Sequence, residues 1–425
     1  MQIEKIEVFP LRVRKEHVYL GDNAGLNTPY DYYLRKEYRC PYSKNMETLV
    51  VKITVQGGIF GWGEALAPVL PDVSGKIISE LFTPILLGRD ALDRNVIWNL
   101  LYDLMRDRGY YSGFMVDAIS AVDCALWDIA GKALNQPVYR LLGGAYREKI
   151  PAYVSGLPVP GLEEKVRLAL EWKEKGFSAI KLQIGYGMEE DIRIMTALRK
   201  ALGPDVKLMI DAHWNYTVPQ AIKLARRLEP LGVEFLECPL NPEDTDGYAE
   251  LAAAVDLPIA LGEADRTHWQ YKEILTKRSC DILQPDVGRC GITELMRIAQ
   301  MAEVFGSRSS HTSWEASSVS PSPIASIMDE ASCSMASDCR ARTESGSIMS
   351  RMTMTMETVN TAPAAMSTGT GNSGCENVHT SVMPARAAMV AASISWLNLG
   401  TPMPRVDTVP DSRFAIIVPP DRRHN

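Results

Sequence analysis

Three acidic residues, Asp211, Glu237 and Glu263, each follow a short apolar segment at an equal spacing of 26 residues (237 − 211 and 263 − 237). Carboxylates that meet in a partly dry pocket repel one another unless a cation lies between them. Oxygen ligands, with positions left for water and substrate, specify Mg²⁺ rather than zinc. The spacing therefore predicts a magnesium site, against the alternative that these are ordinary solvated loop acids such as Glu243 or Asp246.

A lysine precedes this triplet in the apolar segment Ala179–Ile184. Lys181 and Gln183 are two residues apart and so share one face of a strand, which places Lys181 beside the cation site. An ammonium group there can neutralise a substrate carboxylate or donate to an oxygen that becomes negative; the alternative is a strand-end lysine that reaches solvent. Gln183 cannot act as a base.

Two further residues could move or orient a proton. His213 follows Asp211 by two residues and should face the same site, and because histidine titrates near neutral pH it could give a proton to a leaving group. Asp286 could orient an imidazole on the next strand, where His311 is the nearest histidine. The alternatives are a histidine that is hydrogen-bonded for structure and a plain solvated acid.

These residues need a scaffold that brings distant segments together. From Ile150 onward, short apolar segments alternate with amphipathic helical patterns such as Val218–Leu228, at a spacing of roughly 25 residues that is typical of repeated βα units. In a parallel βα barrel the active site lies at the carboxyl ends of the strands, where the candidate residues fall. The predicted strands are Ile150–Gly156, Ala179–Ile184, Lys207–His213, Glu234–Pro239, Pro258–Ala264 and Asp281–Val287.

Residues 1–135 form a separate α+β unit by their pattern. Alternating apolar residues predict three strands joined as a meander, followed by two amphipathic helices. Between the first two strands, residues 17–43 are rich in Tyr, Asn, Gly and Pro and form either a flexible connector or a lid over a pocket. The predicted strands are Ile3–Val13, Thr48–Val55 and Ile59–Glu64, and the predicted helices are Leu92–Asp107 and Met115–Leu134.

The composition changes abruptly after Gly306. Residues 307–425 contain no Lys, Tyr or Gln, are roughly a quarter Ser plus Thr, hold about half of the Met residues, and have lost periodicity. A closed barrel needs eight strands, so two βα units are missing and strand edges are left unpaired. A natural disordered extension is one explanation. A frameshift near the codons for Gly306 and Ser307 fits better, because Ser307–Ser313, back-translated with GC-rich codons, can be read one base out of phase as Pro-Val-Val-Pro-His-Val-Val, a good seventh strand.

The composition of the whole chain bounds the class of protein. Its 425 residues carry a net charge of −7 and are 46% hydrophobic and 23% charged, which is typical of a globular protein and argues against a nucleic-acid or anionic-membrane partner. No apolar run approaches the roughly 18 residues of a transmembrane helix, and the start lacks the pattern of a secretory signal, so we expect a cytoplasmic protein. The eight cysteines show neither zinc spacing nor disulfide density, and we interpret them as reduced thiols.

Over about residues 1–306 the sequence resembles the enolase superfamily, specifically its mandelate racemase/muconate lactonizing enzyme-like subgroup. The resemblance implies an α/β fold, in which an α+β capping domain (1–135) covers a modified (β/α) TIM-type barrel whose first six units span 136–306. It also implies a Mg²⁺ ion, held by the acidic triplet, that stabilises the enediolate formed when a base removes the proton beside a carboxylate. It rests on the triplet and on Gly61-Trp62-Gly63-Glu64-Ala65, Ala125-Leu126-Trp127-Asp128-Ile129-Ala130-Gly131-Lys132, Leu141-Leu142-Gly143-Gly144, Glu237-Cys238-Pro239, Gly262-Glu263 and Gln284-Pro285-Asp286.

The resemblance further implies a reaction. Subgroup members commonly carry Lys-x-Lys on the second barrel strand, but here the later position is Gln183, which disfavours two-base racemisation. Asp-x-His, as in Asp211-Ala212-His213, instead resembles sugar-acid dehydratases of the galactonate dehydratase type, in which that histidine protonates the departing hydroxyl. We expect Lys181 and Mg²⁺ to hold the carboxylate of an aldonate or aldarate, His213 to act as the acid, and a seventh-strand histidine oriented by Asp286 to abstract the α proton.

Departures from the family pattern affect what this chain can do. The family histidine aligns with about position 312, where Thr312 stands with His311 one position away, and the eighth-strand acid that contacts substrate has no evident counterpart. We therefore expect this polypeptide to be poorly folded, inactive, or both. The remaining hypotheses are a racemase or epimerase of a carboxylate substrate and a non-catalytic metal-binding barrel remnant. Relatives often assemble, so a homo-oligomer is a further expectation of the resemblance.

Overall fold

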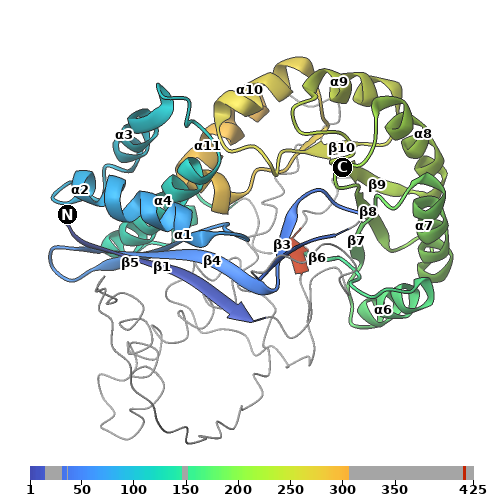
Figure 1. The fold of residues 1–425 in the computed structure, drawn as a ribbon, viewed down its shortest axis with the longest axis horizontal. Helices are drawn as coiled ribbons and strands as arrows, with labels where there is room; N and C mark the ends of the chain where they lie inside the picture. Colours follow the sequence, from blue (N-terminus) through green and yellow to red (C-terminus); the bar gives the residue numbers. More distant parts are fainter. Residues whose placement is uncertain (15–30, 36, 146–151, 306–414, 418–425) are drawn as a thin grey trace, which may run out of the picture. The chain divides into compact units, whose positions relative to one another are not determined.

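The structure is a computed structural model that describes residues 1–14, 31–35, 37–145, 152–305 and 415–417. All of these residues fall within one compact unit of the chain. They form a three-stranded antiparallel sheet with helices, a small hairpin, and a second, mainly parallel sheet (Figure 1). Among them, none of the helices combines the length and apolarity that a membrane crossing requires.

The first sheet is the predicted meander. Strands β1 (Ile3–Arg14), β4 (Asn45–Val55) and β5 (Phe60–Ala65) pair antiparallel in that order. Side chains alternate between the two faces of a strand, so one face of β4 is free to pack against the helices. The fully buried residues on that face of β4 are Leu49, Val51, Ile53 and Val55.

Helices pack against this sheet (Figure 1). The longest, α4 (Phe114–Leu134), lies so close to β5 that a side-chain carbon at Gly63 would overlap the carbonyl oxygen of Ala121. Glycine is therefore required at this position for the helix and the strand to meet. The other helices of this part are α1 (Pro71–Lys76), the π-helical η1 (Ile77–Phe82), α2 (Thr83–Leu86), α3 (Arg94–Arg106) and α5 (Val138–Leu141).

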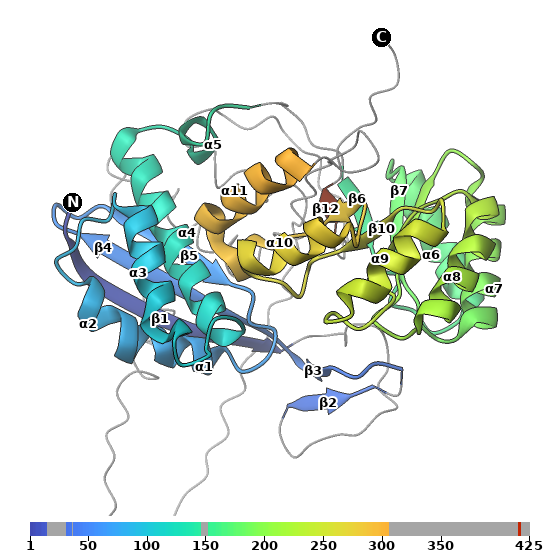
Figure 2. The ribbon, with the colours of Figure 1, turned by 90° about the horizontal axis from the view of Figure 1, so that it is seen from above.

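Residues 17–43, interpreted from the sequence as either a flexible connector or a lid, contain a hairpin. Strands β2 (Tyr32–Leu34) and β3 (Pro41–Ser43) pair antiparallel, with Tyr33 opposite Tyr42 (Figure 2). Residues 17–30 of this stretch lie outside the described residues. The segment between the two strands contacts the mouth of the parallel sheet, as the site geometry below shows.

The second sheet carries the predicted βα units. Six parallel strands lie side by side in chain order, and the six predicted strands are confirmed, although each is shorter than predicted. The strands are β6 (Ala152–Ser155), β7 (Ala179–Gln183), β8 (Lys207–Asp211), β9 (Val233–Glu237), β10 (Ile259–Leu261) and β11 (Ile282–Leu283). The helices that follow them are α6 (Leu162–Glu174), α7 (Met188–Leu202), α8 (Val218–Leu228) with the short η2 (Glu229–Leu231), α9 (Thr245–Ala254), α10 (His268–Lys277) and α11 (Val287–Phe305).

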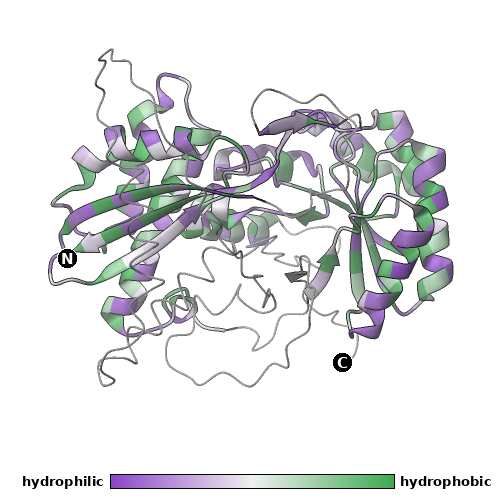
Figure 3. Cartoon of the chain, turned by 60° about the horizontal axis from the view of Figure 1, so that its bottom comes forward, coloured by the Kyte–Doolittle hydropathy of each residue, from purple (hydrophilic) through white to green (hydrophobic). Residues whose placement is uncertain are grey.

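The parallel sheet is apolar on both faces, as its continuous apolar runs predict. One face packs against the helices in the larger core. Figure 3 shows the resulting contrast between largely hydrophobic strands and helices that carry hydrophilic residues. The opposite face forms a small inner layer that consists of Tyr153, Ala179, Met209, Phe235 and Ala260.

One edge of the parallel sheet is paired rather than open. Strand β12 (Ala415–Ile417) lies antiparallel to β6, with Ile416 opposite Tyr153. The sequence predicted unpaired strand edges, and at β6 this is wrong, because the free backbone groups of an edge strand can pair with any available segment. The missing seventh and eighth units and the suspected frameshift concern residues 306–414 and 418–425, which lie outside the described residues.

Helix α4 also holds the sixth βα unit. Trp127 Nε1 donates to Thr293 Oγ1 over 2.9 Å, and that hydroxyl donates to Asp123 Oδ1 over 2.6 Å. The backbone N–H of Thr293 donates to the other oxygen of Asp123 over 2.8 Å. Arg266, which follows β10, forms an ion pair with Asp117 of α4, with Nε 2.7 Å from Oδ1. These contacts fix α11 and the end of β10 against α4.

Candidate active site

The candidate residues of three neighbouring strands lie in register at their carboxyl ends. Gln183 is opposite Asp211, and Asp211 is opposite Glu237. Lys181, Asp211 and Glu237 each come two residues after a side chain of the inner layer, so strand alternation points them into the mouth of the sheet. Asp211 is 5% exposed and Glu237 is 2% exposed. Glu263 follows β10 by two residues, which places the triplet on three successive strands.

The structure brings two of the three predicted metal ligands within reach of one ion. One oxygen of Glu237, one of Glu263 and the sulfur of Cys238 all lie within 4.8 Å of one another. The carboxylate of Asp211 stands outside this group and interacts with His213 instead. Its Oδ1 accepts the backbone N–H of His213 over 3.0 Å and lies 3.0 Å from His213 Nδ1.

Lys181 lies beside the predicted cation site, as its place on β7 implies. Its Nζ is 2.5 Å from Glu237 Oε2 in a buried ion pair. Burial lowers the pKa of Lys181, but the charge of Glu237 outweighs this and the pKa stands well above its ordinary value. Gln183 is 4% exposed in the same row. Among the residues that the structure describes, Lys181 is thus a buried cation of the mouth that is already matched to one carboxylate.

The electrostatics of this cluster indicate a deficit of positive charge. Burial, together with the charges of Asp211 and Glu237, raises the pKa of Glu263 to about 7. Burial also raises the pKa of Glu237, although Lys181 acts in the opposite direction. For Asp211, burial is outweighed by the charge and hydrogen bonding of His213, which lower its pKa to about 2. A divalent cation near Glu237 and Glu263 would offset the burial and the mutual repulsion that raise their pKa values.

The chemistry of the donors fits Mg²⁺. Asp211, Glu237 and Glu263 offer hard carboxylate oxygens in a buried mouth, and Mg²⁺ takes such ligands while keeping positions for water and substrate. Cys238 adds a soft sulfur that Mg²⁺ does not require. Strand alternation would point Cys238 away from Glu237, but its φ of 45° departs from an extended strand. For this reason the sequence pattern did not identify it.

His213 is held between Asp211 and an aromatic ring. Its ring centroid lies 4.3 Å from that of Tyr38, which belongs to the segment between β2 and β3. The Tyr38 hydroxyl donates to the carbonyl of Ile184 over 3.3 Å. Burial lowers the pKa of His213, but Asp211, Glu263 and Glu237 together raise it above its ordinary value. Tyr38 was not predicted as an individual residue, although the tyrosine-rich stretch around it had been interpreted as either a flexible connector or a lid.

Further contacts hold the same segment over the strand ends. Asn215 Nδ2 donates to the carbonyl of Glu37 over 2.8 Å, and Arg39 donates to Asn241 Oδ1 over 3.0 Å. Both barrel residues follow the carboxyl ends of their strands, β8 and β9. The 37–39 segment therefore covers part of the mouth in this structure.

Asp286 occupies a different environment from the triplet. Strand β11 ends at Leu283, so Asp286 stands at the start of α11, where its Oδ1 accepts the backbone N–H of Gly288 over 2.7 Å. Burial raises its pKa to about 6, and the charges that act on it are those of Arg289, Asp117 and Arg266. The imidazole that it is predicted to orient would come from the segment of His311, outside the described residues.

Two family descriptions match the chain. Residues 42–143 match the N-terminal domain of mandelate racemase / muconate lactonizing enzyme, and residues 164–365 match the enolase C-terminal domain-like family. The second match extends past the change of composition at Gly306. Together they agree with the capping sheet and the parallel βα units described above.

Several characterised proteins are similar to this chain. D-galactarolactone cycloisomerase of Agrobacterium fabrum is 37% identical over 265 residues, which cover 61% of this chain and 69% of the relative. Arabinonate dehydratase of Saccharolobus solfataricus is 38% identical over 266 residues, which cover 61% and 71%. D-galactonate dehydratase of Pectobacterium atrosepticum is 35% identical over 272 residues, which cover 60% and 69%. These relatives are sugar-acid dehydratases and a cycloisomerase, so the lineage processes sugar acids.

A solved structure adds a metal to this picture. The crystal structure of a racemase from Streptomyces coelicolor A3(2) with bound magnesium is 28% identical, with a TM-score of 0.64 and coverage of 72% of this chain and 82% of the other. Magnesium is thus bound by a structurally similar protein. The carboxylates at the mouth of this chain are ligands of the type that magnesium takes.

Proposed function

Because the chain belongs to the mandelate racemase/muconate lactonizing enzyme group of the enolase superfamily, we propose that its site is built for Mg²⁺-dependent β-elimination of water from an aldonate or aldarate. The observation that carries this proposal is His213, whose side chain is 11% exposed at the strand ends, between Asp211 and Tyr38 and in the same mouth as the Lys181–Glu237 pair. A proton donor beside a carboxylate-binding lysine is what departure of a β-hydroxyl needs.

The roles follow from the contacts. Lys181 exchanges Glu237 for one oxygen of the substrate carboxylate. Glu237 and Glu263, which lie within reach of one ion, would hold Mg²⁺ together with Asp211 of the neighbouring strand, and the ion when bound supplies positive charge beside that carboxylate as negative charge builds up on it. His213 gives its proton to the β-hydroxyl, which leaves as water while the electron pair of the broken α C–H bond forms the C=C bond. The resulting enol then tautomerises to a 2-keto acid.

Removal of the α proton needs a base on the opposite face of the substrate. Within residues 31–305 as described, the histidines are His213 and His268, and His268 begins the outer helix α10. Gln183 is neutral and cannot take a proton. The predicted base, a histidine oriented by Asp286, would belong to a later segment whose sequence departs from the family pattern. We therefore propose that this chain binds metal and sugar acid and does not complete turnover.

The test is incubation with Mg²⁺ and a panel of aldonates and aldarates, scored for 2-keto acid products. We expect no product from this chain and product from a chain whose reading frame is restored after Gly306. His213→Asn in the restored chain should abolish product formation. If neither chain forms product, the dehydratase proposal fails. Solvent deuterium exchange at the α carbon without water loss would instead indicate a racemase or epimerase.

Cycloisomerisation is a second candidate, favoured by the similarity to D-galactarolactone cycloisomerase. It uses the same α-proton removal, but the group that leaves the β carbon is a ring oxygen and no water is released. Sugar lactones added to the same panel, with products followed by NMR, distinguish the two reactions. A ring-opened 2-keto acid that is isomeric with the lactone, formed without loss of water, together with no product from the open-chain acids, would select the cycloisomerase.

A further inference from the structure

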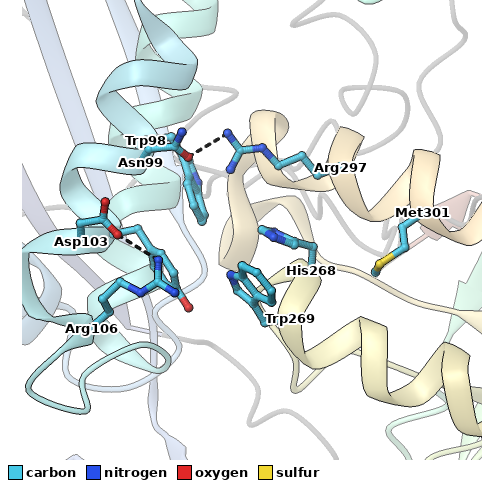
Figure 4. A pocket seen from close by; sticks show the side chains of 9 residues that line it. Trp98, Asn99, Asp103, Arg106, His268, Trp269, Arg297 and Met301 are labelled. Carbon is cyan, nitrogen blue, oxygen red and sulfur yellow. Dashed lines mark hydrogen bonds and ion pairs between the residues drawn. The ribbon is translucent and has the colours of Figure 1, made fainter.

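A pocket separate from the carboxylate cluster lies between α3 and the two outer helices α10 and α11. Its volume is about 480 Å³, within the range that encloses a small molecule. Figure 4 shows Asp103 and Arg106 reaching toward it from α3, and His268, Trp269 and Arg297 reaching toward it from α10 and α11. Neither the predicted metal ligands nor the proposed proton donor line this pocket.

Aromatic rings form the walls. On α3, Trp98 and Tyr102 stack with ring centroids 5.0 Å apart and an interplanar angle of 29°. On α10, His268 and Trp269 lie 4.6 Å apart at 37°. Trp98 is 2% exposed and so forms a fixed wall, whereas Trp269 is 50% exposed at the rim. Flat walls of this kind favour a planar ring, which gains both burial and stacking.

The polar groups of the lining are mainly cationic. The guanidinium of Arg297 lies 4.6 Å from the Trp98 ring, and that of Arg106 lies 5.0 Å from Tyr102 and 5.9 Å from Trp269. Against these two cations the lining holds one carboxylate, Asp103, which accepts from Arg106 over 3.0 Å. Arg297 is matched by the buried Glu294, whereas the side chain of Asp103 is 61% exposed, so Arg106 is the cation at the rim that an anionic ligand could reach.

A buried acid fixes the far wall. Glu294 has no exposed side-chain area, and its two oxygens lie 2.5 Å from His268 Nδ1 and 3.1 Å from Arg297. Arg297 also donates to Asn99 of α3 over 3.0 Å. The wall is thus pre-organised, which reduces the entropy lost on binding.

We propose that this pocket binds a planar aromatic carboxylate, with its ring against the half-exposed Trp269 and its carboxylate on the guanidinium of Arg106 in place of the exposed Asp103. Arg106 is suited to this because a planar guanidinium stacks on aromatic rings and pairs with a carboxylate through two N–H groups. The bound ligand would bridge α3 to α10. This site is independent of the sugar-acid reaction proposed above.

The test titrates the full chain with 1-naphthoate and follows binding by calorimetry. Arg106→Met and Trp269→Ala change partly exposed side chains and should each weaken binding at least tenfold. The matched control is Arg108→Met, which removes a nearby charge outside the lining and should leave the affinity within twofold. A second probe, 1-naphthylmethanol, keeps the ring but not the charge and should bind at least tenfold more weakly.

Three results would overturn the proposal. One is that naphthoate does not bind at millimolar concentration. Another is that both pocket variants bind as tightly as Arg108→Met. The third is that the uncharged probe binds as well as naphthoate. Circular dichroism of each variant, matching that of the unchanged chain, ensures that lost binding is not lost folding.

Discussion

Two sets of acids with low exposure differ in the partners that surround them. At the mouth of the parallel sheet, Glu237 and Glu263 lie beside each other and Lys181 matches only one of them. At the contact with α4, Asp117 has its own guanidinium in Arg266. Asp123, in the same helix, has two hydrogen bonds from Thr293.

The pKa alone does not separate these two sets. Burial raises the pKa of Asp123 to about 6, and burial with neighbouring acids raises that of Glu263 to about 7. The difference is that the nearest charges to Glu263 are other carboxylates, whereas Asp123 is surrounded by donors. Neighbouring carboxylates that lack a matching cation indicate a binding site for a ligand. Carboxylates whose charges and hydrogen bonds are matched indicate a structural role. The experiments below test this distinction.

The largest change in the free energy of unfolding is expected from breaking the ion pair between Arg266 and Asp117. Arg266→Leu leaves the carboxylate of Asp117 buried without its guanidinium, which should lower the free energy of unfolding by about 3–5 kcal/mol. Urea denaturation measures the change. The double variant Asp117→Leu/Arg266→Leu removes both charges and should recover most of the loss. If the single variant loses less than about 1 kcal/mol, this pair does not hold α4 to the end of β10.

Sequence reasoning found the acidic triplet because the period of a βα unit is regular. Once Asp211 ends one strand, Glu237 and Glu263 fall at the equivalent place on the next two, whatever the helices between them contain. The same logic fails wherever the backbone leaves the regular pattern. Cys238 approaches the acids only because its φ is 45°, which no alternation rule anticipates.

Contacts between segments that are far apart in the chain could not be predicted from the sequence either. Tyr38 meets His213 because the hairpin of β2 and β3 reaches across to the strand ends, a tertiary contact without a local signal. Asp286 is predicted to orient an imidazole from the segment of His311, which lies outside the described residues, so this role stays a prediction. The contact of its Oδ1 with the N–H of Gly288 at the start of α11 was not predicted, because it depends on where strand β11 ends.

Removing one acid from the unsatisfied set should affect metal binding rather than folding. Glu263→Gln is expected to weaken Mg²⁺ binding about 100-fold, or about 3 kcal/mol, because a neutral amide replaces a charged ligand. Calorimetric titration with Mg²⁺ measures this. Asp123→Asn is the matched control from the satisfied set and should leave the affinity unchanged. Equal loss in both variants would contradict the separation of the two sets.

The pH dependence of the unfolding free energy should reflect the raised pKa of Asp123, an acid whose hydrogen bonds are matched. Because the folded-state pKa of Asp123 is raised from 3.8 to about 6, the folded chain holds this proton more tightly than the unfolded chain. The contribution is fully present below about pH 4 and is lost as the pH rises through about 6, a change on the order of 2–3 kcal/mol. The stability difference between the unchanged chain and Asp123→Asn should therefore shrink or reverse from pH 4 to 7. A difference that is constant with pH would contradict the raised pKa.

The smallest effect concerns the contact that joins the hairpin to the mouth. Tyr38→Phe removes the hydroxyl that donates to Ile184 and keeps the ring against His213, so the unfolding free energy should fall by about 1 kcal/mol. Tyr38→Leu also removes the stacked ring and should cost about 1 kcal/mol more. The NMR signals of the His213 ring should move in the leucine variant and stay nearly fixed in the phenylalanine variant. If both variants leave these signals fixed, the hairpin does not position the proposed proton donor, and the acid cluster must hold it alone.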